Sequence, residues 1–124
     1  MKKNYYTAIL FAGRPDLHMT LTYYKNLSPE QLAKLVEKVD AVAKNSPLRQ
    51  FRLRADMEAW FGPQHTVRVL QPRFSQMRWP NWVRGLCRSV ESLHVTCKDE
   101  SLDLTATALV VMTKKVEVTR WELK

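Results

Sequence analysis

The chain has 124 residues, 45% of them hydrophobic and 26% charged, which is the balance of a globular protein and excludes a disordered or collagen-like chain. That length suffices for one hydrophobic core but not for two independent ones, so we expect a single domain over residues 1–124. The formal net charge of +8 attracts anionic partners such as nucleotides, nucleic acid or acidic membranes, although a merely basic surface is an equally good explanation of charge alone.

Residues 5–12, YYTAILFA, predict a strand that is apolar on both faces, as a central strand of a sheet would be. Two lysines precede this run as in a signal peptide, but the run is short and no cleavage pattern follows, so we expect no leader. No apolar stretch approaches the roughly 18 residues that a membrane-spanning helix requires, and we expect no membrane partner. Residues 13–16, GRPD, predict a turn.

The next predicted strand, residues 17–24, carries the first histidine. Its alternation places one set of side chains on each face. The predicted polar face holds His18, Thr20 and Thr22, and the predicted apolar face holds Met19, Leu21 and Tyr23.

A helix is predicted to begin after Ser28. Pro29 takes the first helical position and Gln31 stands three residues after Ser28, which is typical of a capping box. Apolar residues then recur at helical spacing up to residues 45–47, NSP, where the helix must end. They are Leu32, Leu35, Val36, Val39 and Val42.

A hairpin and a second helix follow. Residues 49–60 alternate like a strand, Gly62-Pro63 break the pattern, and residues 65–72 are the predicted partner strand. The pattern of residues 80–92 predicts a helix, although the low helix propensity of Gly85 weakens this prediction.

The second histidine lies on a predicted strand over residues 93–98, LHVTCK, and the chain ends in a hairpin of residues 104–113 and 116–123. The order is strand, histidine strand, helix, hairpin, helix, histidine strand, hairpin. Each half then contains a helix and a histidine strand, which suggests a duplicated unit with pseudo-two-fold symmetry.

Two of the three histidines share a His-x-Thr frame, HMT at 18–20 and HVT at 94–96. In a strand, residues i and i+2 point the same way and lie about 6 to 7 Å apart, so each histidine projects together with its threonine. One such pair means little, but two on predicted strands favour function over coincidence. If the strands are neighbours, two imidazoles and two hydroxyls converge on one cleft.

This constellation suits a phosphodiester. Cleavage requires a base that deprotonates the attacking oxygen and an acid that protonates the leaving oxygen, and histidine does either near neutral pH. The threonine hydroxyls can donate hydrogen bonds to the non-bridging oxygens, where negative charge accumulates in the transition state. The sequence therefore indicates a metal-independent phosphodiesterase and implies no cofactor.

With these motifs the sequence resembles the two-histidine (2H) phosphoesterases, which include LigT-like RNA ligases, cyclic phosphodiesterases and nucleotide hydrolases. HMTLTYY resembles the first family motif and LHVTCK the second, and the helices and the hairpin with FGPQ at its turn extend the resemblance over nearly the whole chain. The resemblance implies a bilobal α+β fold, with two pseudo-symmetric lobes of antiparallel sheet, helices on the outside and the active cleft between the lobes.

The resemblance assigns His18 and His94 as the acid and base pair, in an order that it leaves open, and Thr20 and Thr96 as the hydroxyls that hold the phosphate. Lys98 follows the second motif where relatives often have an apolar residue and then a basic one, so the accessory cation also stays open. Because the chain is shorter than typical members, we expect trimmed loops around the pocket.

Other candidate substrate contacts lie outside the two His-x-Thr frames. They are Tyr5, Lys98, Arg73 and Trp79. Arg73 and Trp79 share a loop with Phe74 and Arg78, and loops on a rigid scaffold often supply binding residues. An equally good explanation is that the aromatic side chains cap the core while the arginines stay solvated. His65 has no threonine at i+2 and is predicted to be a turn residue.

The expected partner is a nucleotide or an RNA-terminal phosphodiester, with a 2′,3′-cyclic phosphate, a 2′-5′ linkage or a cyclic oligonucleotide as the bond cleaved. The last is included because the small size resembles compact bacteriophage members of the anti-CBASS type, which destroy cyclic nucleotide immune signals. The alternative is a non-catalytic module of the same fold that binds RNA or nucleotides. No protein partner is indicated, and Cys87 and Cys97 lack metal or redox spacing, which fits reduced thiols in the cytoplasm.

Overall fold

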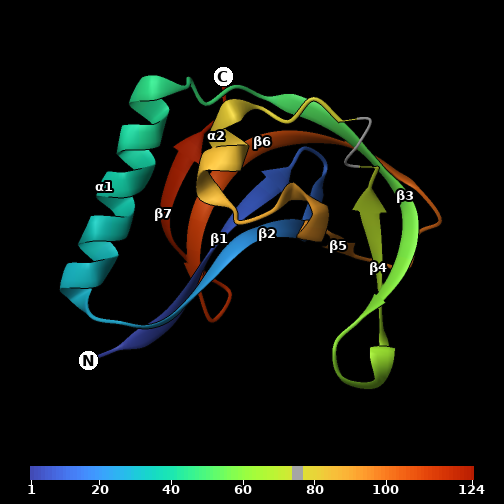
Figure 1. The fold of residues 1–124 in the computed structure, drawn as a ribbon, viewed down its shortest axis with the longest axis horizontal. Coiled ribbons are helices and arrows are strands. Elements are labelled where there is room, and N and C mark those ends of the chain that lie inside the picture. Colours follow the sequence, from blue (N-terminus) through green and yellow to red (C-terminus); the bar gives the residue numbers. More distant parts are fainter. Residues whose placement is uncertain (74–76) are drawn as a thin grey trace.

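The computed structural model describes residues 1–73 and 77–124, and Figure 1 shows how its elements are arranged. The strands are β1 (Lys3–Phe11), β2 (Arg14–Leu27), β3 (Phe51–Phe61), β4 (Val67–Pro72), β5 (Val95–Thr96), β6 (Leu102–Thr113) and β7 (Val116–Glu122). The helices are α1 (Pro29–Asn45) and α2 (Asn81–Leu86), and short 3-10 turns lie at Pro63–His65 and Val90–Ser92. The predicted order of elements is therefore confirmed for the described part of the chain.

The described strands form one seven-stranded antiparallel sheet in the order β1-β2-β5-β4-β3-β6-β7. Because β1 also pairs with β6, six of these strands close into a ring, and β7 lies along the C-terminal half of β6. Strand β6 pairs with β3 through its first half and with β1 through its second, so it runs across both parts of the sheet (Figure 1). This closure makes the two histidine strands, β2 and β5, direct neighbours.

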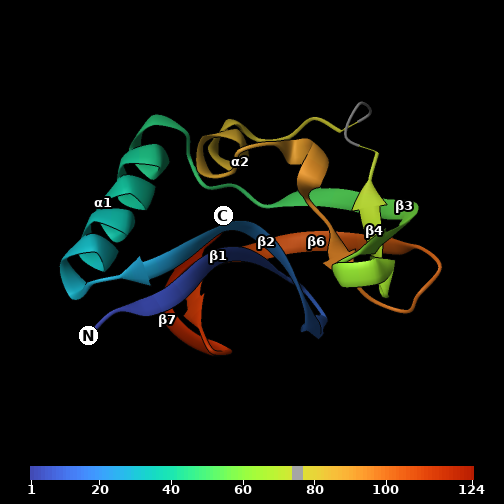
Figure 2. The same ribbon diagram turned by 60° about the horizontal axis from the view of Figure 1, so that its bottom comes forward.

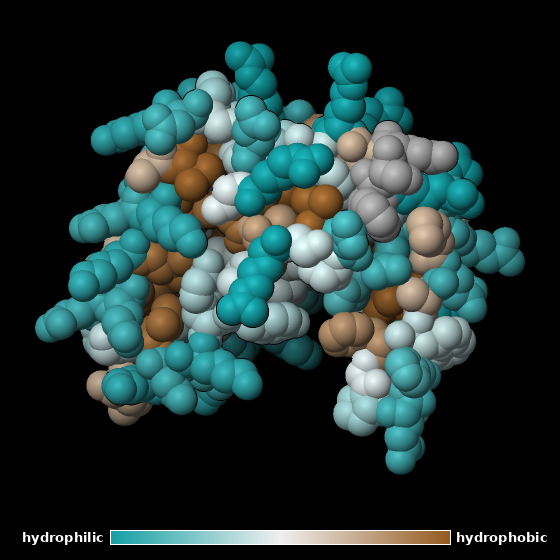
Figure 3. All heavy atoms as spheres, in the orientation of Figure 1, coloured by the Kyte–Doolittle hydropathy of each residue, from teal (hydrophilic) through white to brown (hydrophobic). Residues whose placement is uncertain are grey.

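The molecule has two lobes. Strands β3 and β4 lie at one side and β1, β2 and β7 at the other (Figure 1). The surface is indented at its lower edge, between the mass that holds α1 and the mass that ends in the turn between β3 and β4 (Figure 3). The expectation of a bilobal α+β fold is confirmed.

The core lies between the sheet and the two helices, which cover the same face of it (Figure 2). Helix α1 begins with the predicted capping box: the Gln31 backbone N–H donates to Ser28 Oγ at 3.2 Å, and the Ser28 N–H donates to Gln31 Oε1 at 2.8 Å. Its residues Leu35 and Val39 are buried. Trp82 of α2 is fully buried and meets the ring of Phe51 edge-on. None of the described helices is long and apolar enough to span a membrane.

The second helix is shorter than predicted. The prediction of a helix over residues 80–92 is wrong beyond Leu86, because Cys87 adopts an extended conformation with φ −124° and ψ 157°. Ser89 then starts a separate turn, since its hydroxyl accepts a hydrogen bond from the Glu91 backbone N–H. Such local side-chain bonds compete with helix continuation, and Gly85 supplies little helix propensity to oppose them.

The alternation predicted for the first histidine strand fails at a β-bulge. Strand β1 pairs Thr7 with Thr22 and Ala8 with Thr20, so Leu21 is an extra residue in β2. As a result Thr22 turns toward the helices, where its hydroxyl donates to the Leu86 carbonyl at 2.7 Å. Tyr23 in turn joins the face of His18.

The hairpin between β6 and β7 has an unusual turn. Thr113 pairs with Val116, so the loop consists of Lys114 and Lys115 alone, and both have positive φ, 46° and 65°. A two-residue loop with two positive φ values is a type I′ turn, in which Asn-Gly is strongly preferred. Two lysines therefore hold a conformation that costs free energy for residues with a side chain.

The double replacement Lys114→Asn, Lys115→Gly should raise the free energy of unfolding by roughly 1 kcal/mol, because Asn and Gly adopt the positive φ angles of this turn with less strain than lysine. Urea unfolding measures the change. The control, Lys114→Gln with Lys115→Gln, removes the same two charges but keeps the unfavourable conformation. Equal stabilisation in both variants would mean that charge and not backbone strain is responsible.

Candidate functional site

A single residue pair brings the two motifs together. Strand β5 pairs with β2 through Val95 and Met19, and both side chains are fully buried in the core. Extending this antiparallel register by one residue in each direction places His18 opposite Thr96 and Thr20 opposite His94. All four side chains then project from the face opposite to the core, because successive residues of a strand point to opposite faces.

His18, Thr20, His94 and Thr96 stand at the corners of a square, with the histidines on one diagonal and the threonines on the other. Each histidine has the threonine of its own motif two residues away along the strand and the threonine of the other motif directly across. The two histidines stand on a diagonal, with their α-carbons about 7 to 8 Å apart.

Two depressions in the surface are each lined by two of these four residues. One, of about 670 Å³, is lined by Thr20 and His94, and the other, of about 500 Å³, by His18 and Thr96. Each depression therefore receives a histidine from one motif and a threonine from the other. The first also contains two cations, Lys38 and Arg88.

His94 is held from two sides. Its Nδ1 lies 3.0 Å from the Ser92 carbonyl oxygen, so Nδ1 carries the hydrogen and donates it, which leaves Nε2 for proton exchange. The ring of Phe61 lies 4.7 Å from the imidazole, centroid to centroid. Phe61 ends β3 and is 57% exposed. The sequence motifs do not indicate Phe61, although an aromatic residue directly before the Gly62-Pro63 turn is a signal that could have found it.

His18 has a different environment. The ring of Tyr6 lies 5.7 Å from it, on the neighbouring strand β1. Burial lowers the pKa of His18 from its ordinary value of 6.5, and the nearby charge of His94 lowers this pKa further. The neutral form of His18 is therefore favoured at pH 7, and a neutral imidazole can accept a proton.

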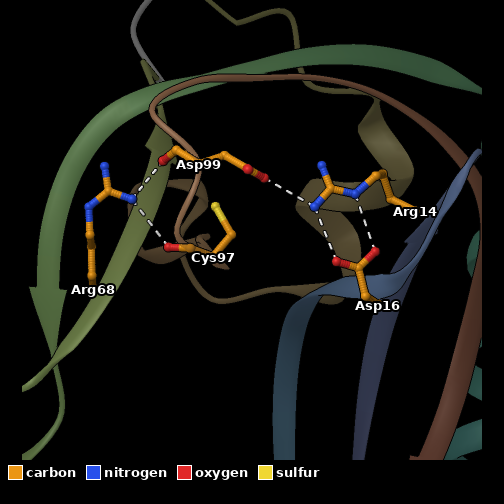
Figure 4. A network of polar contacts seen from close by, with 5 residues as sticks. All are labelled: Arg14, Asp16, Arg68, Cys97 and Asp99. Carbon is orange, nitrogen blue, oxygen red and sulfur yellow. Dashed lines mark hydrogen bonds and ion pairs between the residues drawn. The ribbon is translucent and has the colours of Figure 1, made fainter.

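A network of arginines anchors the segment that follows β5 (Figure 4). The Arg68 guanidinium on β4 donates to the carbonyl oxygens of Cys97 and Asp99, at 3.2 and 2.6 Å. The Asp99 carboxylate accepts from Arg14, at the start of β2, at 3.1 Å. Arg14 also binds Asp16 and lowers the pKa of that carboxyl group. The segment is thus tied to both strands that flank β5.

This anchoring explains why β5 is shorter than predicted. The predicted strand covered residues 93–98, but β5 contains only Val95 and Thr96. The carbonyls that follow bind the Arg68 side chain instead of a neighbouring strand. Lys98 lies exposed between the two anchored residues, and its contact with substrate stays a prediction.

Several candidate contacts lie elsewhere. Tyr5 and Trp79 are 8% and 5% exposed and belong to the core, so little of either side chain is open to a substrate, and their contacts with substrate stay predictions. They are buried because Tyr5 is on the core face of β1, next to Tyr6, and Trp79 packs against Phe51. Arg73 is paired with Asp56 at 3.2 Å on the surface.

Three other predictions concern the loop and the hairpin turn. Arg78 is exposed, and Phe74 lies outside the described residues. His65 is an exposed residue of the 3-10 turn after β3, as predicted. Within residues 1–73 and 77–124, no three His, Cys, Asp or Glu side chains are grouped as metal ligands.

Comparison with solved structures finds the same fold in phosphoesterases. The crystal structure of a phosphoesterase superimposes with a TM-score of 0.62 and 15% identity, over 98% of this chain and 99% of that one. The E. coli LigT complexed with 3′-AMP gives a TM-score of 0.63 and 16% identity, over 100% and 99% of the two chains. The same protein complexed with NADP+ gives 0.60 and 17%, over 99% of each.

Comparisons with protein-family models and with curated proteins give no match. The structural likeness nevertheless extends over the full chain. The chain therefore has the fold of the 2H phosphoesterases, which its two His-x-Thr motifs predicted.

The importance of the arginine anchor can be measured. Arg68→Met should lower the free energy of unfolding by about 1.5 to 3 kcal/mol, because it removes charged hydrogen bonds from carbonyls beside the buried strand. The matched control is Arg73→Met, which removes a surface ion pair and should cost less than about 1 kcal/mol. Urea unfolding of both variants tests this, and equal losses would show that Arg68 does not anchor the segment.

Proposed function

We propose that the protein is a metal-independent phosphodiesterase that acts on a nucleotide phosphodiester with His18 and His94 as its acid and base pair. The observation that carries this proposal is the Met19–Val95 register, which supports the placement of two imidazoles and two hydroxyls around one site. The shared fold with LigT and another phosphoesterase supports the same class of reaction.

The proposed reaction is a direct displacement at phosphorus. His18, neutral at pH 7, removes a proton from the attacking water, and the water oxygen forms the new bond to phosphorus. The bond to the leaving oxygen breaks on the opposite side, and His94 donates the proton that this oxygen takes up. We assign the role of base to His18 because burial, and then the nearby charge of His94, lower its pKa and so favour its neutral form.

Other groups of the proposed site stabilise the negative charge on the phosphate oxygens or orient the histidines. Thr20 and Thr96 stand across from the two histidines, where their hydroxyls can donate to the non-bridging oxygens without competing for the transferred protons. Lys38 and Arg88 line the His94 depression and add positive charge for the phosphate. The Ser92 carbonyl keeps the His94 ring in one tautomer and orientation during the transfer.

A nucleotide is the proposed substrate class. LigT has been crystallised with 3′-AMP, ATP, NADP+ and phosphate, which supports a site for nucleotide phosphates in this fold. We propose three candidate bonds for cleavage: a 2′,3′-cyclic phosphate, a 2′-5′ linkage, and a linkage within a cyclic oligonucleotide. The last class includes the immune signals that bacteriophage enzymes of the anti-CBASS type destroy. We propose the cytoplasm as the compartment of the protein, because Cys87 and Cys97 are both free thiols.

His18→Ala and His94→Ala should each lower turnover by about 100-fold or more, because general acid or base catalysis contributes about 10² to 10⁴. The assay uses EDTA-treated protein and all three substrate classes, with products separated by chromatography. His65→Ala is the matched control and should retain full turnover. Loss of activity on EDTA treatment would contradict the metal-independent mechanism. Nucleotide binding without any turnover would favour the non-catalytic binding module instead.

The pH dependence of kcat/KM should be bell-shaped, because one histidine must be neutral and the other protonated. Burial lowers the pKa of His18 in the folded protein, so the fraction of neutral base falls only at acidic pH. The acid limb should therefore have its midpoint below 6.5, the ordinary value for histidine. Steady-state kinetics across the pH range measures it, and an acid limb centred above 6.5 would contradict His18 as the base.

A further inference from the structure

A cluster of lysines lies beside the His18 depression. Lys2, Lys3 and Lys114, here called the lysine cluster, line a separate depression of about 510 Å³. Tyr6 lines both this depression and that of His18. The two are therefore adjacent, and Lys115, next in the chain after Lys114, already lines the His18 side.

The charges of the lysine cluster are not neutralised within the described part of the chain. Every ion pair between described residues is made by an arginine and none by a lysine. The nearby carboxylates are engaged elsewhere: Asp16 binds Arg14, and Glu117 binds Arg120. The cluster therefore offers free positive charge to an anion in solution.

The backbone supplies an independent indication. Lys114 and Lys115 occupy the two positive-φ positions of a type I′ turn, where Asn-Gly would be more stable. Local rules of this kind are broken mainly at functional positions, where another requirement outweighs the loss of stability. Charge is the property that these two residues share.

A row of aromatic rings connects the two depressions. The Tyr6 ring lies 5.7 Å from that of His18 and 5.8 Å from that of Tyr23. Tyr23 is 71% exposed and, with Tyr6, lines the depression of the lysine cluster. Exposed aromatic side chains along a basic groove are the platform on which single-stranded nucleic acids stack their bases.

We infer that the substrate is a single-stranded oligonucleotide whose chain continues from the reacting phosphodiester past Tyr6 and Tyr23 to the lysine cluster. This inference rests on the proposed function and specifies its substrate class. Strand β1 runs from Leu10, opposite His18, to Lys3, roughly 23 Å at the rise of a strand. A path of that length exceeds one nucleotide, so the lysines bind phosphates beyond the reacting one.

The test compares two substrates that contain the same cleavable bond. One is the smallest molecule with the bond that the wild type cleaves, and the other is a single strand of about six nucleotides that ends in it. The measured quantity is the ratio of their kcat/KM values, long over short. The triple variant Lys2→Gln, Lys3→Gln, Lys114→Gln removes the lysine cluster. The control Lys34→Gln, Lys44→Gln, Lys124→Gln removes the same charge elsewhere.

The wild type should prefer the long substrate by at least about 10-fold, and the triple variant should lose most of this preference while the control keeps it. The logarithm of kcat/KM for the long substrate should also fall more steeply with the logarithm of salt concentration, by about 0.7 for each added phosphate contact. Circular dichroism of each variant confirms its fold.

Three outcomes overturn the inference. Equal kcat/KM values for the two substrates, or a preference that survives in the triple variant, would reject the lysine cluster while leaving the phosphodiesterase in place. Cleavage of cyclic oligonucleotides alone would also reject it, because such substrates have no continuing strand. Cleavage of no substrate at all would overturn the proposed function and this inference with it.

Discussion

The contact between Met19 and Val95 is the constraint on which the site depends. Because β2 is also paired with β1, a shift of one residue in β5 would turn the side chains of His94 and Thr96 into the core and that of Val95 outward. Because Val95 is fully buried, such a shift would expose its apolar side chain and bury the His94 imidazole. The hydrophobic core therefore determines the arrangement of the polar groups on the other face.

Strand β5 is too short to secure this register by its own hydrogen bonds. It makes one residue pair with β2 and two with β4. The additional restraint comes from the segment after it, where Arg68 and Arg14 hold Asp99 from the two flanking strands. These arginines belong to the two lobes, one on β4 and one on β2, so the same network that positions the second motif also joins the lobes beside it.

The sequence predicted the elements whose patterns are local. The capping box of α1 and the turns between paired strands are encoded by neighbouring residues, and the structure has them where expected. The bulge at Leu21 was not predictable, because it changes the pairing with β1 without changing the apolar pattern. A strand that is apolar on both faces does not indicate which face is the core, so the sequence did not show that Tyr5 points into the core while Tyr6 lies beside His18. The roles of His18, His94, Thr20 and Thr96 stay predictions, to which the structure adds their adjacency.

The irregular features of the sheet lie along one path. The bulge at Leu21 turns Tyr23 toward the ring of Tyr6, and the strained turn at Lys114 places positive charge beside the same two rings. Without the bulge, the Tyr23 side chain would point to the core face of β2. An Asn-Gly turn would form a more stable hairpin, but it would carry no charge. Both departures from regular structure cost stability, and both add a binding group to the face of His18. Because bulges and strained turns persist where the surrounding structure holds them, their common location supports the proposal that this face binds the substrate.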